Sequence, residues 1–216
     1  MKYLGLRLDR RLSFEDHFRE VKSDQAALAL ARLLPNLGGP GGKARRLYAG
    51  VVASIALYSA PVWAGEAAKN RRIQSALHNA QRRIAGRIIK AYKTVSHAVA
   101  TTLAGTPPLL LLVESYAETY ATVARIKARR GYNAITPDLV AQIKDRNRRD
   151  MMLKWEQWIS SSGRGGSSVV RAILPRLGEW TSARTGLSCR ATQILTGHGC
   201  FGRFLRRIGR ETTEKC

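Results

Sequence analysis

The chain is organised around residues 43–93, whose first part reads KARRLYAGVVASIALYSAPVW at residues 43–63. Bulky or apolar residues recur there at three and four positions, the period of a helix face turned to a core. These residues are Leu47, Val51, Ser54, Ile55, Tyr58 and Val62. Because the remaining positions are mostly small, we expect a helix that is buried on nearly all sides. Pro61 and Gly65 predict the break that ends it.

A basic helix is expected next, at residues 69–93, which read KNRRIQSALHNAQRRIAGRIIKAYK. One stripe is apolar and consists of Ile73, Leu77, Ala80, Ile84 and Ile88. Other positions carry Arg71, Arg72, Arg82, Arg83, Arg87, Lys90 and Lys93. No acid occurs between Glu66 and Glu114. Like charges at i and i+4 destabilise a solvated helix, so a helix of one sign indicates an anionic partner.

The composition indicates a folded and strongly basic protein. Its 216 residues are 44% apolar, which is enough to build one domain or two small ones. The 37 Lys and Arg against 15 Asp and Glu give a net charge of +22. Self-repulsion at this charge is costly unless a polyanion neutralises it, as in ribosomal, chromatin and nucleic-acid-processing proteins. An acidic membrane is a weaker match, because the cations are spread along the chain.

The cysteines and the N-terminal residues favour an intracellular protein, nuclear or cytoplasmic. Cys189, Cys200 and Cys216 are too few for a disulfide scaffold and fit a reducing compartment. The first nine residues, MKYLGLRLD, contain no apolar core of signal-peptide length. The LLLLV run at residues 109–113 falls far short of the roughly 20 residues that span a bilayer.

A hairpin arm and a helix are expected before the central stretch. Residues 3–9 alternate loosely, as in a strand, and a turn follows at residues 9–11. Ser13, with Glu15 and Asp16 in the next turn, is typical of a helix start. This helix is expected to reach Leu34, with an inward face at Phe14, Phe18, Val21 and Leu28. Residues 35–42, PNLGGPGG, are read as a turn, because they lack the Lys-Ser/Thr ending of a phosphate-binding loop.

Helix signals continue after residue 95. Ser96 is expected to cap a short helix that stops at Gly105, and a longer helix is expected from residues 106–108 to a stop at Gly131. Residues 136–138, TPD, start another helix, and residues 160–168, SSSGRGGSS, have the composition of a linker. Beyond it, we expect a helix at 169–177 broken by Pro175, an anchor at Trp180 and a helical turn or two at 190–196.

The end of the chain mixes aromatic and basic residues, in TGHGCFGRFLRRIGR at residues 196–210. This mixture suits backbone contacts together with base stacking, with Arg203, Arg206 and Arg207 as contacts. The alternative is a loop that packs Phe201, Phe204 and Ile208 inward. The sequence leaves both readings open.

Residue patterns for catalysis are missing from the sequence. Polymerase and nuclease chemistry needs clustered carboxylates that hold divalent metal, and the chain has no adjacent Asp pair. The spacing of His198 and Cys200 is not a familiar zinc arrangement. The G-x-S-x-G pattern of serine hydrolases is absent, and no base accompanies Cys189 or Cys200. We expect no catalytic centre and no cofactor in this chain.

Six ordered segments resemble the reverse transcriptase polyprotein of non-LTR (LINE-type) retrotransposons, particularly the type-one elements that insert into ribosomal RNA genes. They are YLGLRLD (3–9), LARLLPNLGGPG (30–41), LYAGVVASIALYSAPVW (47–63), QRRIAGRIIKAY (81–92), LAGTPP (103–108) and TQILTGHGCF (192–201). The resemblance covers essentially the whole chain. It implies a mainly α fold: a helical, thumb-like bundle with a short N-terminal β-hairpin arm and a small C-terminal helical region.

The resemblance also implies which parts of the RNA-directed DNA polymerase the chain lacks. The family's catalytic aspartate pair lies upstream of the YLG segment, so the fingers and most of the palm, with their magnesium, are expected to be missing. Cys216 falls where the family begins a zinc knuckle, so the zinc site is expected to be missing too. The chain alone is therefore expected to bind nucleic acid and not to polymerise. Its partners would be RNA, DNA or a hybrid and the polyprotein's own palm and fingers.

The resemblance assigns a role to each segment. Residues 1–12 would be a remnant of the palm and primer-grip hairpin, where Gly5 permits close approach of the backbone. Residues 13–94 would be a thumb that grips the template–primer duplex, 95–160 a helical linker region, 161–168 a flexible linker and 169–216 a basic region leading to a truncated knuckle. The candidate contacts are Tyr3, Gly5, Arg45, Arg46, Arg71, Arg72, Arg82, Arg83, Arg87, Lys90, Arg203, Arg206 and Arg207. Contacts to phosphate position a nucleic acid without reading its sequence.

Two alternatives stay open at this point. The chain could be a non-catalytic helical module, derived from a retroelement, whose core contacts a protein. It could also be a pseudogene product without function. A protein partner would give binding with a shallow salt dependence, in contrast to the steep dependence of phosphate contacts.

Overall fold

The computed structural model describes residues 1–216 except 21–22, 162–166, 185, 200, 211 and 214–216. The chain is mainly helical with one small antiparallel sheet, which confirms the expected fold class. The sheet consists of β1 (Lys2–Tyr3) and β2 (Leu6–Arg7). The helices are α1 (Glu15–Glu20), α2 (Ser23–Arg32), α3 (Gly42–Ala56), α4 (Ala60–Lys69), α5 (Arg71–Ile88), α6 (His97–Ala104), α7 (Leu109–Arg130), η1 (Tyr132–Ala134), α8 (Pro137–Ser160), α9 (Ser168–Ile173), η3 (Leu174–Arg176), α10 (Leu177–Ala183), α11 (Cys189–Thr196) and α12 (Gly202–Arg207).

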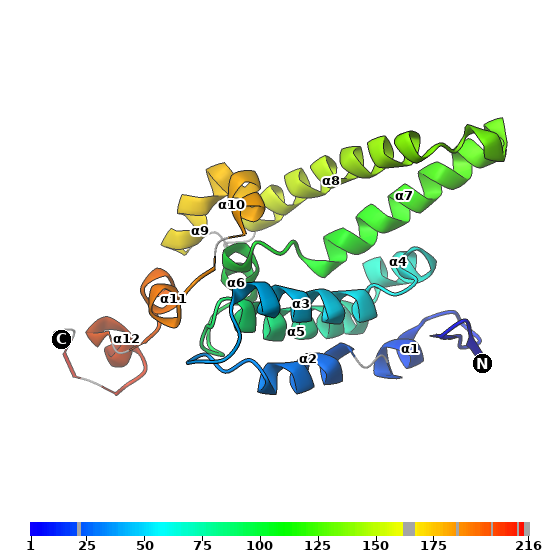
Figure 1. The fold of residues 1–216 in the computed structure, drawn as a ribbon. Coiled ribbons are helices and arrows are strands. Elements are labelled where there is room, and N and C mark those ends of the chain that lie inside the picture. Colours follow the sequence, from blue (N-terminus) through cyan, green and yellow to red (C-terminus); the bar gives the residue numbers. More distant parts are fainter. Residues whose placement is uncertain (21–22, 162–166, 185, 200, 211, 214–216) are drawn as a thin grey trace.

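The helices form a packed body from which one long pair projects (Figure 1). In the body, α5 packs against α2, α3 and α6, and α4 packs against α7. The helices α7 and α8 pack on each other and meet at η1, at the far end of the projection. Near the body these two helices diverge, and α8 leads to α9 and α10. α11 and α12 lie at the C-terminal end, far from β1 (Figure 1).

Two apolar clusters form the core. The first extends from Ala27 to Leu177 and includes the fully buried Trp155 and Ile159 of α8. The second gathers Leu6 and Phe14 around Trp63, Ile73 and the start of α7. The first cluster takes residues from both sides of the expected boundaries near residues 94 and 168. The division of the chain into separate domains therefore stays a prediction.

The helix α5 lies at the centre of the body, and its apolar stripe is confirmed. All five predicted residues, Ile73, Leu77, Ala80, Ile84 and Ile88, are buried. Asn70 caps the helix by accepting a hydrogen bond from the Arg72 N–H, which satisfies one of the free donors of the first turn. The helix is shorter than expected at both ends and covers residues 71–88.

The expected orientation of α3 is wrong. Leu47 is 69% exposed, and Val51, Tyr58 and Val62 are exposed as well. The buried residues of α3 are instead Arg45, Ala49, Val52 and Ala56. This face is mostly small, which lets the backbone of α3 approach α5 closely. The bulky residues that the periodicity placed in the core therefore lie on the surface.

The break after α3 lies earlier than expected. Ser59 adopts a left-handed conformation with φ of 53°, and α3 and α4 meet there at 81°. Pro61 occupies the first turn of α4, where its missing N–H costs no hydrogen bond, so it starts a helix and does not end one. Gly65 lies inside α4.

The N-terminal arm differs from the expected strand. Residues 2–7 form the hairpin themselves, with Leu4 and Gly5 at the turn and Tyr3 paired with Leu6. The turn expected at residues 9–11 is organised by the Asp9 carboxylate, which accepts hydrogen bonds from the backbone N–H groups of Arg11, Ser13 and Phe14. Asp9 therefore fixes the start of the helical region.

The single helix expected from Ser13 to Leu34 is present as α1 and α2. Phe14 is buried and Phe18 packs against the second cluster, as expected, but Leu28 is exposed. Val21 lies outside the described residues. The reading of residues 35–42 as a turn is consistent with the structure, in which their carbonyl groups accept hydrogen bonds from Arg45.

Most of the later helix signals are confirmed. The hydroxyl groups of Ser96 and Thr136 cap α6 and α8, and α6 ends at Gly105 and α7 before Gly131. The helix α7 starts at Leu109, with Pro108 at its cap. Pro175 lies in η3 between α9 and α10. Within the described residues, no single helix has the length and hydropathy to cross a membrane, although the bent pairs α3–α4 and α6–α7 meet this criterion together.

Candidate nucleic-acid interface

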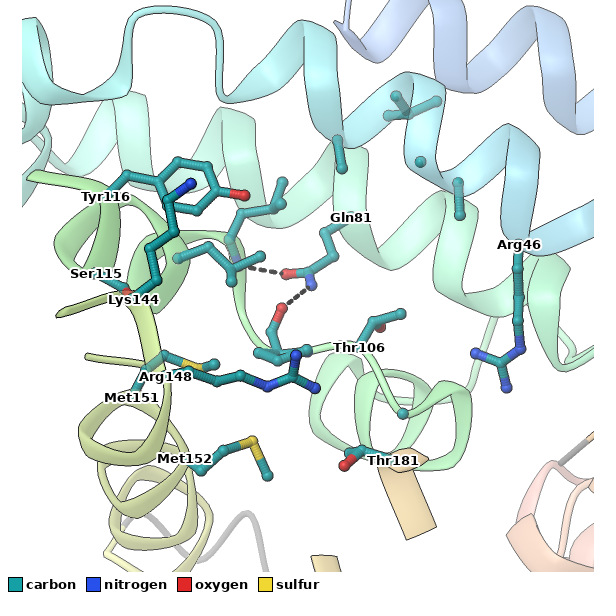
Figure 2. A pocket seen from close by; sticks show the side chains of 18 of the residues that line it. Arg46, Gln81, Thr106, Ser115, Tyr116, Lys144, Arg148, Met151, Met152 and Thr181 are labelled. Carbon is teal, nitrogen blue, oxygen red and sulfur yellow. Dashed lines mark hydrogen bonds between the residues drawn. The ribbon is translucent and has the colours of Figure 1, made fainter. Parts of the chain in front are cut away.

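A cleft of about 1350 Å³ lies between the body and the projecting helices. Its walls come from α3, α5, the segment between α6 and α7, the first half of α7, one face of α8 and the end of α10. The floor is apolar and includes Val52, Ile84, Ile88, Leu109 and Leu112. Polar and aromatic side chains line the rim (Figure 2).

Four cations line the cleft, and none of its described lining residues is acidic. Lys144 and Arg148 lie one turn apart on α8 and are exposed. Arg46 reaches in from α3 and Arg184 from the end of α10. Figure 2 shows Arg46 and Arg148 entering the cleft from different sides. Because four cations and no carboxylate are among the described lining residues, the potential in the cleft attracts anions.

Arg46 is held in place by the body. Its guanidinium donates a hydrogen bond to the Ala104 carbonyl at 2.7 Å. Burial, together with the charge of Arg184, lowers the pKa of Arg46 from its ordinary value. The two arginines therefore repel each other, and an anion between them would relieve this repulsion.

Hydrogen bonds fix the walls on which these cations lie. Asn147 of α8 donates to the Thr119 hydroxyl of α7 at 2.9 Å and keeps the two helices in register. Near the body, Lys154 pairs with Glu114 at 2.9 Å. The two walls of the projecting pair are thus joined at two points along their length.

Gln81 fixes the segment that closes the end of the cleft. Its amide nitrogen donates to the Pro107 carbonyl at 2.6 Å, and its amide oxygen accepts from the Leu109 N–H at 3.0 Å. Figure 2 shows both bonds at the cleft wall. The start of α7 therefore depends on a buried side chain of α5.

Aromatic and sulfur-containing side chains complete the lining. Tyr116 and Tyr120 lie one turn apart on α7 and are 47% and 65% exposed. Met151 and Met152 lie opposite them on α8. These groups offer flat or polarisable apolar surface next to the cations.

The structure contradicts the expectation for Arg45, which has no exposed surface. Its guanidinium donates to the backbone carbonyls of Leu34, Pro35, Gly38, Pro40 and Arg87. Burial, and next the charge of Arg87, lower the pKa of Arg45 from its ordinary value. Arg45 joins the glycine-rich loop to α5, so it is a structural residue and is not available to phosphate.

The expected contacts on α5 lie outside the cleft, and several have partners in the body. Arg72 pairs with Glu15 at 2.8 Å. Arg82 donates to the carbonyls of Lys93 and Val95, and Arg87 to the Asn36 side chain. Arg71 and Arg83 are exposed, and Lys90 is half-buried with a left-handed backbone just after the helix.

The remaining expected contacts are not among the residues that line the cleft. Tyr3 is exposed on the hairpin, and Gly5 has φ of 82° and lies against the ring of Tyr58. The group that approaches Gly5 in this structure is Tyr58, which follows α3, and the expected contact with a primer stays a prediction. Arg206 and Arg207 are exposed on α12, where Arg207 lies over the Phe204 ring, and the side chain of Arg203 lies outside the described residues.

Inward packing, one of the two interpretations of the C-terminal mixture, fits part of the structure, and the nucleic-acid contact stays a prediction. Phe201 and Phe204 are half-buried, which fits inward packing, whereas Ile208 is exposed. His198 contacts the Phe204 ring and the Thr196 carbonyl. Cys200 lies outside the described residues. Within the described part, no group of three or more His, Cys, Asp or Glu side chains could hold a metal ion.

Sequence reasoning missed the residues that line the cleft opposite Arg46. Lys144, Arg148, Arg184, Tyr116 and Tyr120 line the cleft but were not among the contacts expected from the sequence. The pattern of two cations and two methionines on one face of α8, at 144, 148, 151 and 152, was the available signal. It indicates a face but does not identify the helix across from it.

The six sequence segments that carry the family resemblance contact one another. Tyr58 donates to the Leu4 carbonyl at 2.7 Å, and Asn36 to the Ala91 carbonyl at 2.9 Å. Gln81 joins the fourth segment to the fifth at Pro107. The Thr192 hydroxyl donates to the Ile89 carbonyl and joins the sixth segment to the fourth. These segments therefore hold the body together.

Comparison with known proteins finds relatives along the whole chain. A 115 kDa protein in the type-1 retrotransposable element R1DM of Drosophila melanogaster is 29% identical and matches 100% of this chain. A retrovirus-related Pol polyprotein from the type-1 retrotransposable element R1 4 of Nasonia vitripennis is 25% identical, again over 100% of this chain. No family model matches the sequence. No solved structure matches it either.

The relatives are longer than this chain, which spans 22% of the Drosophila protein and 56% of the Nasonia polyprotein. Both belong to R1-type elements by name, and the resemblance noted from the six segments is thereby confirmed. The chain is therefore a homologue, over its whole length, of proteins from R1-type non-LTR retrotransposons.

Proposed function

We propose that this chain is a nucleic-acid-binding part of a retrotransposon polyprotein and that the cation-lined cleft is its main contact surface. The cleft lies between α3 and α5, which belong to the expected thumb, and α7 and α8, which belong to the expected linker region. The observation that carries the proposal is the wall composition, with Arg46, Lys144, Arg148 and Arg184 and no carboxylate among the described lining residues.

The net charge of the chain supports a polyanionic ligand. A charge of +22 on 216 residues opposes compaction unless it is neutralised in use. Nucleic acid offers closely spaced phosphates that can bridge cations on both sides of the cleft. In the polyprotein, we propose that this region grips the template and primer through phosphate, whereas magnesium and zinc are held by other parts of the polyprotein.

We further propose that the chain binds without polymerising. Its described acids serve as turn and surface partners, such as Asp9 in the N-terminal turn and Glu15 with Arg72. Primer extension with added template, primer and magnesium tests this part of the proposal. Incorporation of nucleotides by this chain alone would contradict it.

A binding experiment with a matched control tests the cleft. The double variant Lys144→Gln, Arg148→Gln removes two cleft cations that lie at i and i+4 on α8. The control, Arg125→Gln with Arg129→Gln, removes two exposed cations at the same spacing on α7 that do not line the cleft. Fluorescence anisotropy with labelled RNA, DNA and hybrid oligonucleotides should show weaker binding for the cleft variant than for the control. Equal effects would contradict a cleft-specific site.

A second candidate function rests on exposed apolar side chains, which are Leu47 and Val51 of α3, Tyr58 between the two helices and Val62 of α4. Exposed apolar residues that gather into a patch are typical of protein-binding surfaces. A protein-interaction module would bind its partner with a shallow salt dependence. Replacement of Val51 by Asp would weaken that interaction and leave nucleic-acid binding unchanged.

A further inference from the structure

The proposed function leaves open whether the cleft takes a duplex or a single strand. A duplex presents phosphates and sugars on its outside and keeps its bases stacked within, so cations alone suffice to bind it. Aromatic side chains become useful when the bases are unstacked and their faces are available. The composition of the cleft therefore distinguishes the two ligands.

The side of the cleft that α7 forms carries two tyrosines. Tyr116 and Tyr120 are separated by one helical turn and keep 47% and 65% of their surface exposed. The lining residues of the same helix are the small Ser115 and Thr119 and, at either end of the pair, the apolar Leu112 and Val123. Because about half or more of the surface of each tyrosine stays exposed, the rings remain available for stacking.

Two of the cleft's cations lie on α8. Lys144 and Arg148 on α8 line the same cleft as these tyrosines, and Figure 2 shows Arg46 entering from a different side. Arg184 also lines the cleft and lies close enough to Arg46 to lower its pKa. Ile84, Leu109 and Met151 add apolar atoms to the lining. A strand with its phosphates on the cations would place its bases over apolar and aromatic surface, which is the arrangement of single-strand binding grooves.

The cleft has room for an extended ligand. The volume of about 1350 Å³ exceeds the roughly 300–1,000 Å³ of pockets that enclose one small ligand. It therefore accommodates a few nucleotide units.

We propose that the cleft binds single-stranded nucleic acid, with phosphates on Lys144, Arg148, Arg46 and Arg184 and bases stacked on Tyr116 and Tyr120. This inference rests on the proposed nucleic-acid function and specifies its substrate class. The exposed cations of α5, which lie outside the cleft, do not contribute to the preference for a single strand.

Tyrosine variants of the full chain test the stacking. Tyr116→Ala with Tyr120→Ala should weaken binding of a labelled single-stranded oligonucleotide by a factor on the order of ten or more, as expected when base stacking is lost. Tyr116→Phe with Tyr120→Phe keeps both rings and should bind like the wild type. Tyr132→Ala is the control, because this tyrosine is 73% exposed at the tip, packs under Lys127 and does not line the cleft.

Competition with unlabelled strands supplies the second readout. A single strand should displace the labelled strand at lower concentration than a duplex of equal length and sequence, and the alanine variant should lose this difference. Equal competition by duplex, or unchanged single-strand affinity in the alanine variant, would overturn the inference.

The outcome also separates this inference from the proposed function. If the tyrosine variants bind normally while Lys144→Gln, Arg148→Gln binds weakly, the cleft contacts phosphate only, so the inference fails and the proposed function stands. If neither set of variants affects binding, both the inference and the proposed function fail. Circular dichroism confirms that each variant is folded.

Discussion

The side-chain amide of Gln81 donates a hydrogen bond to the carbonyl of Pro107, with 2.6 Å between nitrogen and oxygen. The same side chain accepts from the Leu109 N–H and contacts His97 Nε2. One buried residue of α5 thus fixes the turn between α6 and α7, and with it the direction in which α7 leaves the body. The shape of the cleft depends on this contact.

Replacement of Gln81 by Leu should destabilise the fold. The substitution leaves the Pro107 carbonyl and the Leu109 N–H without partners, and each unsatisfied buried group costs about 1–3 kcal/mol. We expect the free energy of unfolding, measured with urea, to fall by about 2–5 kcal/mol. Asn79→Ala, at an exposed position of the same helix, should change it by less than about 0.5 kcal/mol. Equal stability of both variants would show that the contact is dispensable.

Replacement of Arg45 by Met should destabilise the fold, and its effect should not be limited to nucleic-acid binding. Its buried guanidinium donates hydrogen bonds to five backbone carbonyls, and each buried carbonyl left without a partner costs about 1–3 kcal/mol. Arg45→Lys should not restore stability, because an ammonium group cannot reproduce the planar fork of donors. Urea unfolding of both variants is the measurement. A stable Arg45→Met variant that binds nucleic acid weakly would instead support a phosphate contact.

The N-terminal turn should open as the pH falls. The backbone N–H of Ser13, aided by its hydroxyl and by the N–H groups of Arg11 and Phe14, lowers the pKa of Asp9. A carboxylate whose folded pKa is lowered stabilises the fold above its unfolded value of about 3.9, and this stabilisation is lost as the pH falls through the folded pKa. NMR of residues 1–14 should show the change, and Asp9→Asn should abolish the dependence. Identical acid titrations for both proteins would contradict this role.

His17 should stabilise the fold in its neutral form, which is the form present at higher pH. Burial lowers the pKa of His17, and its Nδ1 accepts from the Arg7 N–H at 3.4 Å, which requires the neutral ring. The folded state disfavours protonation of His17. Its stabilising contribution is therefore complete above the unfolded pKa of about 6.5 and decreases as the pH falls towards the folded pKa. Urea unfolding between pH 7.5 and 5.5 measures this decrease. His17→Gln should flatten the profile; an unchanged profile would assign the pH dependence elsewhere.

The sequence was most informative where its signals were local. The apolar residues of α5 recur with a single helical period on one face, so their burial could be predicted directly from the sequence. Caps such as Ser96 and Thr136 act within one turn and need no knowledge of the rest of the fold. These features were predictable because the interactions that cause them lie within a few residues.

The orientation of α3 was not predictable in the same way. Apolar residues occur on several of its faces, and hydrophobicity favours the bulky face of Leu47, Val51 and Tyr58. Close packing against α5 instead selected the face with Ala49, Val52 and Ala56. Arg45 and Arg46 show the same limit, because adjacent residues on a helix lie about 100° apart, and only the packing partner decides which one is buried.

The cleft could not be found from the sequence alone. Arg46 and Arg148 are separated by roughly 100 positions, and their meeting depends on how α7 and α8 return to the body. Periodicity gives the face of each helix and not its neighbour. The candidate residues on α5 were identified by charge, yet packing placed them outside the cleft.

The salt dependence of nucleic-acid binding tests the central claim most directly. For the wild type and for Lys144→Gln, Arg148→Gln, log affinity is measured against log salt with the same single-stranded oligonucleotide. If both cations contact phosphate in the cleft, the variant's slope should be shallower by about 1.4, and the control Arg125→Gln, Arg129→Gln should keep the wild-type slope. Parallel lines for wild type and the cleft variant would contradict the claim.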